Sequence, residues 1–186
     1  MKFAAQLQLY DEAGRRKYLN SSERERLLIA ADDLGPAESA FLYVLTFTGC
    51  RVSEALAMTS HHLDGQTDTI TFRTLKRRRL IFRTVPVPPE VTELLLRLDR
   101  PGDLPFWTMH RSTAWRLVSR TMASASIEGP MACCKGLRHS FGMRAADRNV
   151  PQPVIQRWMG HASPATTAIY IDAIGVEERA FASRMW

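Results

Sequence analysis

The segment that most constrains the fold lies between Gly35-Pro36 and Gly49. Proline is favoured at the first position of a helix and glycine just beyond its end, so this segment is predicted to be one helix. Its apolar side chains include Phe41, Leu42, Val44, Leu45 and Phe47. Because they cover most sides of the helix rather than one stripe, other elements have to pack around it. The sequence therefore predicts a buried helix.

Shorter elements are predicted on both sides of this helix. Ser22 and Glu25 have the spacing of a capping box, which opens a helix that runs to about Asp33. Apolar residues at helical spacing, with Pro, Ser and Gly signals at the ends, predict helices at 52–58, 89–98, 112–124, 135–149, 154–159 and 164–170. Residues 70–75 and 80–87 are rich in β-formers and flank Lys76-Arg77-Arg78-Arg79, which predicts a basic hairpin. The predicted fold class is mostly α, with a small antiparallel β-hairpin or three-stranded sheet.

The charge of the chain favours an anionic partner. Its 186 residues suit one domain with a real core, and the formal net charge is +6. All but four of the 25 basic residues are arginines, whose planar fork suits bidentate phosphate contacts. A GC-rich genome would produce the same bias, and a basic protein with no special partner is the alternative. Composition alone leaves both interpretations open.

The cysteines and histidines predict no metal site. Cys50, Cys133 and Cys134 are odd in number and form no C-x-x-C motif, and the histidines do not join them at ligand spacing. The chain has neither an apolar run long enough to span a membrane nor a signal-peptide core. We therefore expect a cytoplasmic protein with reduced cysteines, no metal and no cofactor.

Arg51 and Glu54 are the first candidates for phosphate chemistry. Arg51 is predicted near the N-terminus of a helix, where exposed N–H groups favour an anion, and Glu54 can orient its guanidinium. The alternative is a surface ion pair worth a few tenths of a kcal/mol. In the hairpin, Lys76 is the group able to donate a proton, and Arg73, Arg77, Arg78 and Arg79 are candidates for backbone phosphates. The alternative for that run is a solvated turn.

The last fifty residues carry the other candidates. Lys135 and Arg138 lie three apart, so they share a helix face and form either a phosphate clamp or plain surface charge. His139 points elsewhere and is interpreted as structural. His161 follows Gly160 at a helix end, and Tyr170 lies on a helix capped by Ser163. A C-cap charge and an ordinary half-buried aromatic are the alternatives for these two.

Taken together, these motifs resemble the tyrosine recombinase (phage integrase) family from about Leu19 to Tyr170. The most specific matches are Thr48-Gly49-Cys50-Arg51-Val52-Ser53-Glu54-Ala55-Leu56, Gly136-Leu137-Arg138-His139-Ser140-Phe141, and Met159-Gly160-His161 followed by Thr166-Thr167-Ala168-Ile169-Tyr170. The resemblance implies the catalytic-domain fold of that family. It also implies a site-specific DNA recombinase that cleaves and rejoins a specific double-stranded site without metal or ATP.

The resemblance assigns a role to each position. Tyr170 corresponds to the nucleophile that forms a 3′-phosphotyrosine, and Lys76 to the lysine that protonates the leaving 5′-oxygen. Arg51 and Arg138 correspond to the arginines on the non-bridging oxygens, and His161 to a phosphate-supporting position. The acidic residue that supports the arginines corresponds to Glu54. Lys135 departs from the family's histidine, and a lysine is a weaker base near neutrality.

The resemblance also divides the chain. Residues 1–20 are expected to be a short basic arm, 21–174 the catalytic domain, and 175–186 a tail helix. The family's N-terminal DNA clamp is missing, as in the compact recombinases that invert fimbrial promoter switches, so the chain is such an enzyme or a fragment. In the family the tail docks on a neighbouring protomer, which implies a dimer to tetramer on DNA. Phe181, Met185 and Trp186 are the candidate knob, and packing on their own domain is the alternative.

Two other functions stay open at this point. One is a DNA-binding accessory protein that kept the fold without the chemistry, and the other is relaxation of DNA like a type IB topoisomerase. Covalent DNA attachment excludes the first, and Holliday-junction formation from paired sites excludes the second. The location implied is the prokaryotic cytoplasm, with association to the nucleoid when bound to DNA. Target sequence and biological event (integration, resolution or inversion) are not encoded in these motifs.

Overall fold

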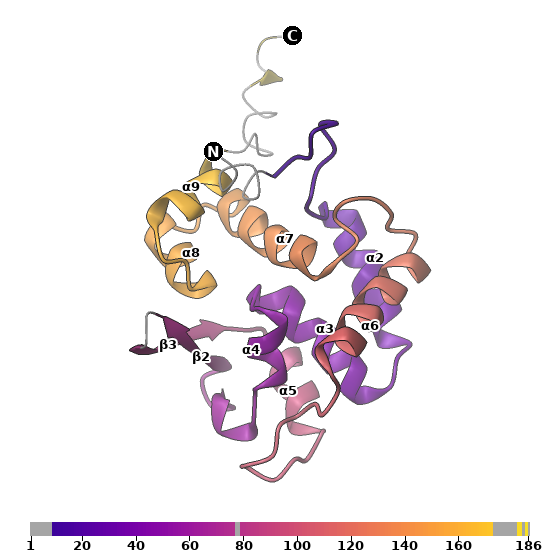
Figure 1. The fold of residues 1–186 in the computed structure, drawn as a ribbon, viewed down its shortest axis with the longest axis vertical. Helices are drawn as coiled ribbons and strands as arrows, with labels where there is room; N and C mark the ends of the chain where they lie inside the picture. Colours follow the sequence, from indigo (N-terminus) through magenta and orange to yellow (C-terminus); the bar gives the residue numbers. More distant parts are fainter. Residues whose placement is uncertain (1–8, 77–78, 173–181, 184, 186) are drawn as a thin grey trace.

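The fold is a helical domain with one small sheet (Figure 1). The computed structural model describes residues 9–76, 79–172, 182, 183 and 185, with backbone alone at 74–76 and 79–80. Its helices are α2 (Ser21–Asp32), α3 (Pro36–Thr48), α4 (Val52–Leu56), α5 (Pro89–Leu96), α6 (Arg111–Ser124), α7 (Cys134–Asp147), α8 (Gln152–Met159) and α9 (Pro164–Ile171), with a 3₁₀ turn η1 (Ser60–His62). The strands are β1 (Leu63–Asp64), β2 (Thr69–Lys76) and β3 (Arg79–Pro86). The predicted fold class is confirmed.

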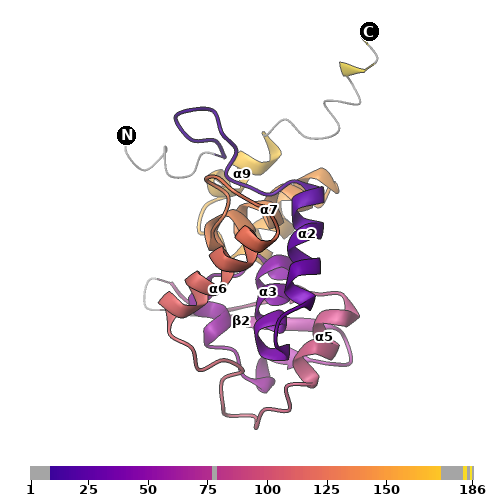
Figure 2. The ribbon, with the colours of Figure 1, turned by 90° about the vertical axis from the view of Figure 1, so that its right-hand side faces the viewer.

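The helix predicted to be buried is α3, and it is central in the fold. Phe41, Leu42 and Val44 are fully buried, and the helix packs against α2, α5 and α7. It ends at Gly49, whose φ of +59° is the left-handed conformation that glycine adopts at low cost. A Cβ at Gly49 would also lie 2.6 Å from the Phe141 ring, so the close approach of α3 and α7 depends on glycine. Figure 2 shows α2 beside α3 and α6 on one side of the molecule.

The capping box of α2 was predicted at the wrong residues. The N-cap is Asn20, whose Oδ1 accepts from the Glu23 N–H at 2.8 Å, while the Glu23 carboxylate accepts from the Asn20 N–H at 2.9 Å. Glu23 is buried and also pairs with Arg16, a contact that Glu25 on the exposed side cannot make. That pairing with a residue outside the helix explains why the box forms two residues earlier than expected.

The sheet has the antiparallel order β1-β2-β3. In the long hairpin, Ile70 pairs with Val85 and Phe72 with Arg83. Side chains alternate between the two faces of a strand, so Arg83, Val85 and Val87 all point into the core. An arginine therefore occupies an inward-facing position of β3.

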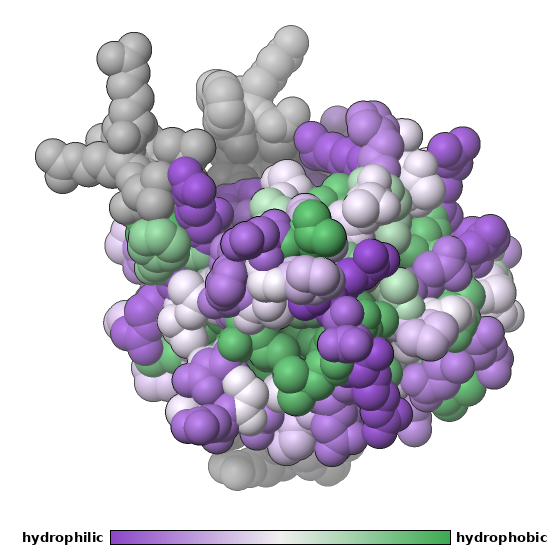
Figure 3. Space-filling view, turned by 90° about the horizontal axis from the view of Figure 1, so that it is seen from below, coloured by the Kyte–Doolittle hydropathy of each residue, from purple (hydrophilic) through white to green (hydrophobic). Residues whose placement is uncertain are grey.

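Two hydrophobic clusters divide the interior. The larger is built on α2 to α6 and the sheet, and reaches α7 through Leu137. The smaller contains Leu9, Met143, Ile155, Met159 and Tyr170, and joins α7, α8 and α9. In Figure 1 the helices of the smaller cluster lie above α3, α4 and the sheet. Seen from below, apolar residues gather in the middle of that face and polar residues ring it (Figure 3).

Candidate active site

Arg51 and Glu54 form the ion pair that their spacing predicts. Arg51 is the residue before α4, and its Nη1 donates to Glu54 Oε1 at 2.9 Å while its backbone N–H donates to Oε2 at 2.8 Å. The side chain of Arg51 is 46% exposed and that of Glu54 only 7%. The buried carboxylate therefore anchors a guanidinium that still reaches solvent.

Arg83 is a second partner of Glu54 that was not predicted. Its Nη2 donates to Glu54 Oε2 at 2.6 Å and its Nη1 to Oε1 at 3.1 Å, while its Nε donates to the Trp158 carbonyl at 2.8 Å. Burial by itself would raise the pKa of Glu54, but the hydrogen bonds and charges of Arg83 and Arg51 outweigh it and lower the pKa to about 2. Glu54 is therefore ionised at neutral pH. The sequence signal was an arginine at an inward-facing strand position.

Arg138 connects the end of α3 to the end of α8. From α7, its Nη1 donates to the Gly49 carbonyl at 2.6 Å and its Nη2 to the Met159 carbonyl at 2.5 Å. Burial, and then the charge of Arg51, lowers the pKa of Arg138 to about 10, which leaves it cationic at neutral pH. Two guanidiniums, from Arg51 and Arg138, are thus held near each other by backbone and carboxylate contacts.

Tyr170 is buried in the smaller cluster and is only 3% exposed. Its hydroxyl lies 3.0 Å from Nδ1 of His139, and its ring stacks on the His161 ring with centroids 6.1 Å apart. A Cβ at Gly142 would lie 2.6 Å from the tyrosine ring, so the ring can pack this close to α7 only because residue 142 has no side chain. Burial raises the pKa of Tyr170 to about 12, although the charge of Arg138 acts in the opposite direction. The phenol is therefore protonated and turned inward.

His161 occupies the end of α8, as predicted. It follows Gly160, which has a φ of +64°, and its Nδ1 lies 2.9 Å from the Thr167 hydroxyl. Burial and the charges of Arg138 and Arg51 lower the pKa of His161 to about 3. The imidazole is therefore neutral at pH 7 and can take part in hydrogen bonds, which argues against the alternative of a C-cap charge.

The remaining predicted residues are described less fully. Lys135 is exposed on α7, one turn before Arg138, and Arg73 is exposed on β2. Lys76 pairs with Arg79 at the end of the hairpin, where only the backbone is described. Arg77 and Arg78 lie outside the described residues. The structure thus brings together Arg51, Glu54, Arg138, His161 and Tyr170, which were predicted separately.

A groove opens beside this cluster. It encloses about 220 Å³ between β3 and α8, and its lining includes Phe82, Arg83, Gly160 and His161. Among residues 9–76 and 79–172, no three His, Cys, Asp or Glu side chains gather as metal ligands do. No helix within that part of the chain is long and apolar enough to cross a membrane.

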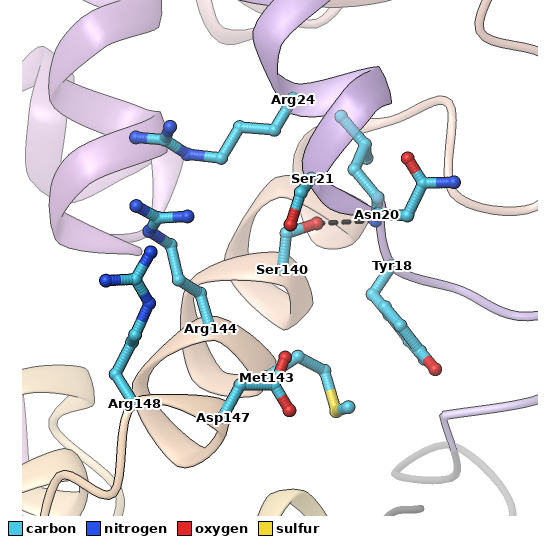
Figure 4. Close-up of a pocket in the computed structure, with 10 residues that line it drawn as sticks. Tyr18, Asn20, Ser21, Arg24, Ser140, Met143, Arg144, Asp147 and Arg148 are labelled. Atoms are coloured by element: carbon cyan, nitrogen blue, oxygen red, sulfur yellow. Dashed lines mark hydrogen bonds between the residues drawn. The ribbon is translucent and has the colours of Figure 1, made fainter. Parts of the chain in front are cut away.

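A separate pocket of about 390 Å³, lined by basic residues, lies between α2 and α7 (Figure 4). Arg24, Arg144 and Arg148 line it, and in Figure 4 their guanidinium groups lie on the same side. Arg24 also covers the Phe47 ring, 4.4 Å from its centroid. Burial, and then the charge of Arg144, lowers the pKa of Arg24 to about 10. Helical spacing puts this pocket on the side of α7 away from Arg138, so it is separate from the candidate site.

The buried histidine predicts how stability depends on pH. Burial lowers the pKa of His139 to about 4 from the usual 6.5, so below pH 6.5 the unfolded chain binds a proton that the folded chain does not. The stabilisation is complete above pH 6.5 and is lost as the pH falls toward 4. His139→Gln should therefore reduce the loss of unfolding free energy between pH 7 and 4.5 by roughly 1–2 kcal/mol.

Denaturant titrations at a series of pH values measure this effect. His61→Gln is the matched control, because that histidine is 69% exposed, and its curve should follow that of the parent protein. Parallel curves for the parent and His139→Gln would contradict the prediction.

Comparison with known proteins gives a consistent result. The model of the phage integrase family matches residues 17–174. Tyrosine recombinase XerA of Pyrococcus furiosus is 28% identical over 166 residues, which cover 83% of this chain and 56% of that protein. The chain therefore spans little more than half the length of such a relative.

Solved structures agree with the sequence match. The crystal structure of XerA recombinase matches with a TM-score of 0.76 and 27% identity, covering 90% of this chain and 64% of that one. XerH site-specific recombinase bound to its difH substrate matches with a TM-score of 0.75 and 20% identity, covering 94% of this chain and 59% of that one. At that identity the second match bears on the fold alone.

Proposed function

Because the chain belongs to the phage integrase family, we propose that it is the catalytic domain of a site-specific DNA recombinase. The observation that carries the proposal is the convergence of Arg51, Arg138, His161 and Tyr170, which come from four separate segments, on one site. The substrate is double-stranded DNA with a specific site. XerH site-specific recombinase, which shares the fold, was solved bound to its difH substrate.

The reaction breaks one phosphodiester and conserves its energy. The Tyr170 hydroxyl oxygen attacks the phosphorus, the bond from phosphorus to the 5′-oxygen breaks, and a 3′-phosphotyrosine forms. The tyrosine proton passes to a base, and Lys76 gives a proton to the leaving 5′-oxygen. Attack by a 5′-hydroxyl of the partner strand then reverses the step and releases Tyr170. The proposed reaction requires neither a metal ion nor ATP.

The cations stabilise the charge that develops on phosphorus. Each terminal nitrogen of Arg138 donates one hydrogen bond to a backbone carbonyl. Its Nε–H and one hydrogen on each terminal nitrogen can still donate to phosphate oxygens. Arg51, beside it and half exposed, provides the second fork. His161 is neutral and supports a phosphate oxygen by a hydrogen bond. Arg73, Arg77, Arg78 and Arg79 contact the DNA backbone.

Lys135 takes the place of the family's histidine as the candidate base. Because imidazole is the better general base near neutrality, Lys135→His should increase the rate of cleavage at pH 7 and move the pH optimum downward. Rates of adduct formation from pH 6 to 9 for both proteins measure this effect. Identical profiles would show that residue 135 does not handle the proton.

A denaturing gel tests the function. The protein is first used to select bound sites from random-sequence DNA, and a nicked duplex of the selected site is then offered. Because the nick releases the fragment that carries the 5′-hydroxyl, cleavage should leave a slowly migrating protein–DNA adduct. DNA binding without an adduct would favour the accessory-protein alternative, and Holliday junctions from paired sites would exclude simple relaxation.

We also propose assembly on DNA through residues 175–186. Residues 173–181, 184 and 186, and with them Phe181 and Trp186 of the predicted knob, lie outside the described residues, whereas Met185 is described and is 83% exposed. A knob that docks on the next protomer would build a closed ring. The mass of the protein–DNA complex, with and without residues 175–186, tests this assembly.

A further inference from the structure

Arg83 is the most buried charged side chain of the candidate site. Its side chain is 3% exposed, and its guanidinium carbon lies 4.9 Å from the Phe72 ring centroid. A buried cation is costly unless hydrogen bonds and an opposite charge compensate it. The fork of Arg83 meets both oxygens of Glu54, so this pair satisfies that condition.

Among the described side chains, two guanidinium cations, those of Arg51 and Arg83, contact the single negative charge of Glu54. Arg83 binds both oxygens from inside the protein, whereas the Arg51 side chain makes one contact and is half exposed. A bidentate, desolvated pair is the stronger one. Arg83 therefore takes up most of the negative charge of Glu54, and Arg51 remains oriented by Glu54 without being neutralised.

Arg83 also fixes the end of α8. Its Nε donates to the Trp158 carbonyl, and Arg138 donates to the next carbonyl, that of Met159. These two carbonyls immediately precede Gly160 and His161, and carbonyls at a helix C-terminus bind cations favourably. Arg83 therefore connects β3 to α4, which begins just after Arg51, and to α8, which ends two residues before His161.

We infer that Arg83 is a positioning residue of the recombinase site, which frees the charge of Arg51 for the DNA phosphate and holds His161 in place. The inference rests on the proposed function, but no step requires Arg83 to touch DNA. Its effect on Arg51 passes through Glu54, and its effect on His161 passes through the Trp158 carbonyl.

Three variants separate charge from structure. Arg83→Met removes the cation at similar length, so Glu54 should neutralise Arg51, and adduct formation at saturating DNA should slow by about tenfold or more. Adding Glu54→Gln removes that carboxylate charge, so the double variant should recover part of the lost rate. Arg83→Lys keeps the charge but not the fork, and should lie between the parent protein and Arg83→Met. Arg97→Met, at an exposed arginine beyond α5, is the control.

Rates and DNA affinities are measured on variants that show the parent protein's circular dichroism. A purely structural role would predict no gain in rate from the second substitution. The inference is overturned if Arg83→Met cleaves within twofold of the parent protein, or if the double variant is no faster than the single one. Should Arg83→Met not fold, the same test applies to Arg83→Gln, which also removes the cation, with and without Glu54→Gln. If the parent protein and Arg97→Met form the adduct, the proposed function stands even when the inference about Arg83 fails.

Discussion

Tyr170→Phe should abolish the covalent DNA adduct and leave DNA affinity within about twofold of the parent value. The substitution removes only the hydroxyl that we propose attacks phosphorus, and no other group at that position replaces a phenol oxygen. The hydroxyl is buried against His139 in the free protein, so its loss does not alter the exposed surface. Denaturing gels measure the adduct, and fluorescence anisotropy with labelled duplex measures the affinity.

Tyr18→Phe is the matched control for this experiment. Tyr18 is also partly buried, and its hydroxyl lies 3.2 Å from that of Tyr10, outside the candidate site. Each variant loses one hydrogen bond, worth about 0.5–1.5 kcal/mol of stability, and the loss should be larger for Tyr170, whose bond is buried, than for Tyr18, whose bond is exposed. An adduct that persists in Tyr170→Phe would refute Tyr170 as the nucleophile.

Arg138→Lys should slow adduct formation by about 10²- to 10³-fold, which is the usual effect of removing one preorganised donor to a developing oxyanion. A guanidinium donates to the Gly49 and Met159 carbonyls and still has N–H groups for phosphate, whereas one ammonium cannot span both carbonyls and a ligand. Single-turnover rates at saturating DNA measure the loss.

The control for Arg138→Lys lies on the same stretch of chain. Arg148 is exposed just beyond α7, away from the site, and Arg148→Lys should cleave at the parent rate. An Arg138→Lys variant that cleaves within threefold of the parent would show that position 138 needs only a positive charge, without bidentate geometry.

The sequence predicted those parts of the fold that depend on local signals. Glycine at Gly49 and Gly160 and proline at Pro36 and Pro164 mark helix ends because their backbone preferences are intrinsic. The box at Asn20 was missed because its carboxylate, that of Glu23, is stabilised by Arg16, a residue outside the helix. Local patterns do not contain that information.

The site was predicted residue by residue but not as an arrangement. The contact of Arg138 with the Gly49 carbonyl joins residues 89 positions apart, and no spacing rule predicts it. Arg83 was missed because its strand was interpreted by its β-formers, and the register that turns it inward follows from pairing with Phe72. His139 was interpreted as structural, and its contact with the Tyr170 hydroxyl required the docking of α9 on α7.

The division of the interior into two clusters has a consequence for hydrogen exchange. The smaller cluster buries few side chains, so separating α8 and α9 from the rest costs less free energy than unfolding the whole domain. Amide protons of α8 and α9 should therefore exchange through a partial opening, ahead of those in α3. Tyr170, the proposed nucleophile, belongs to that weaker unit. We therefore expect its hydroxyl to reach solvent through the same partial opening, and the rate of opening to set an upper limit on the rate of adduct formation.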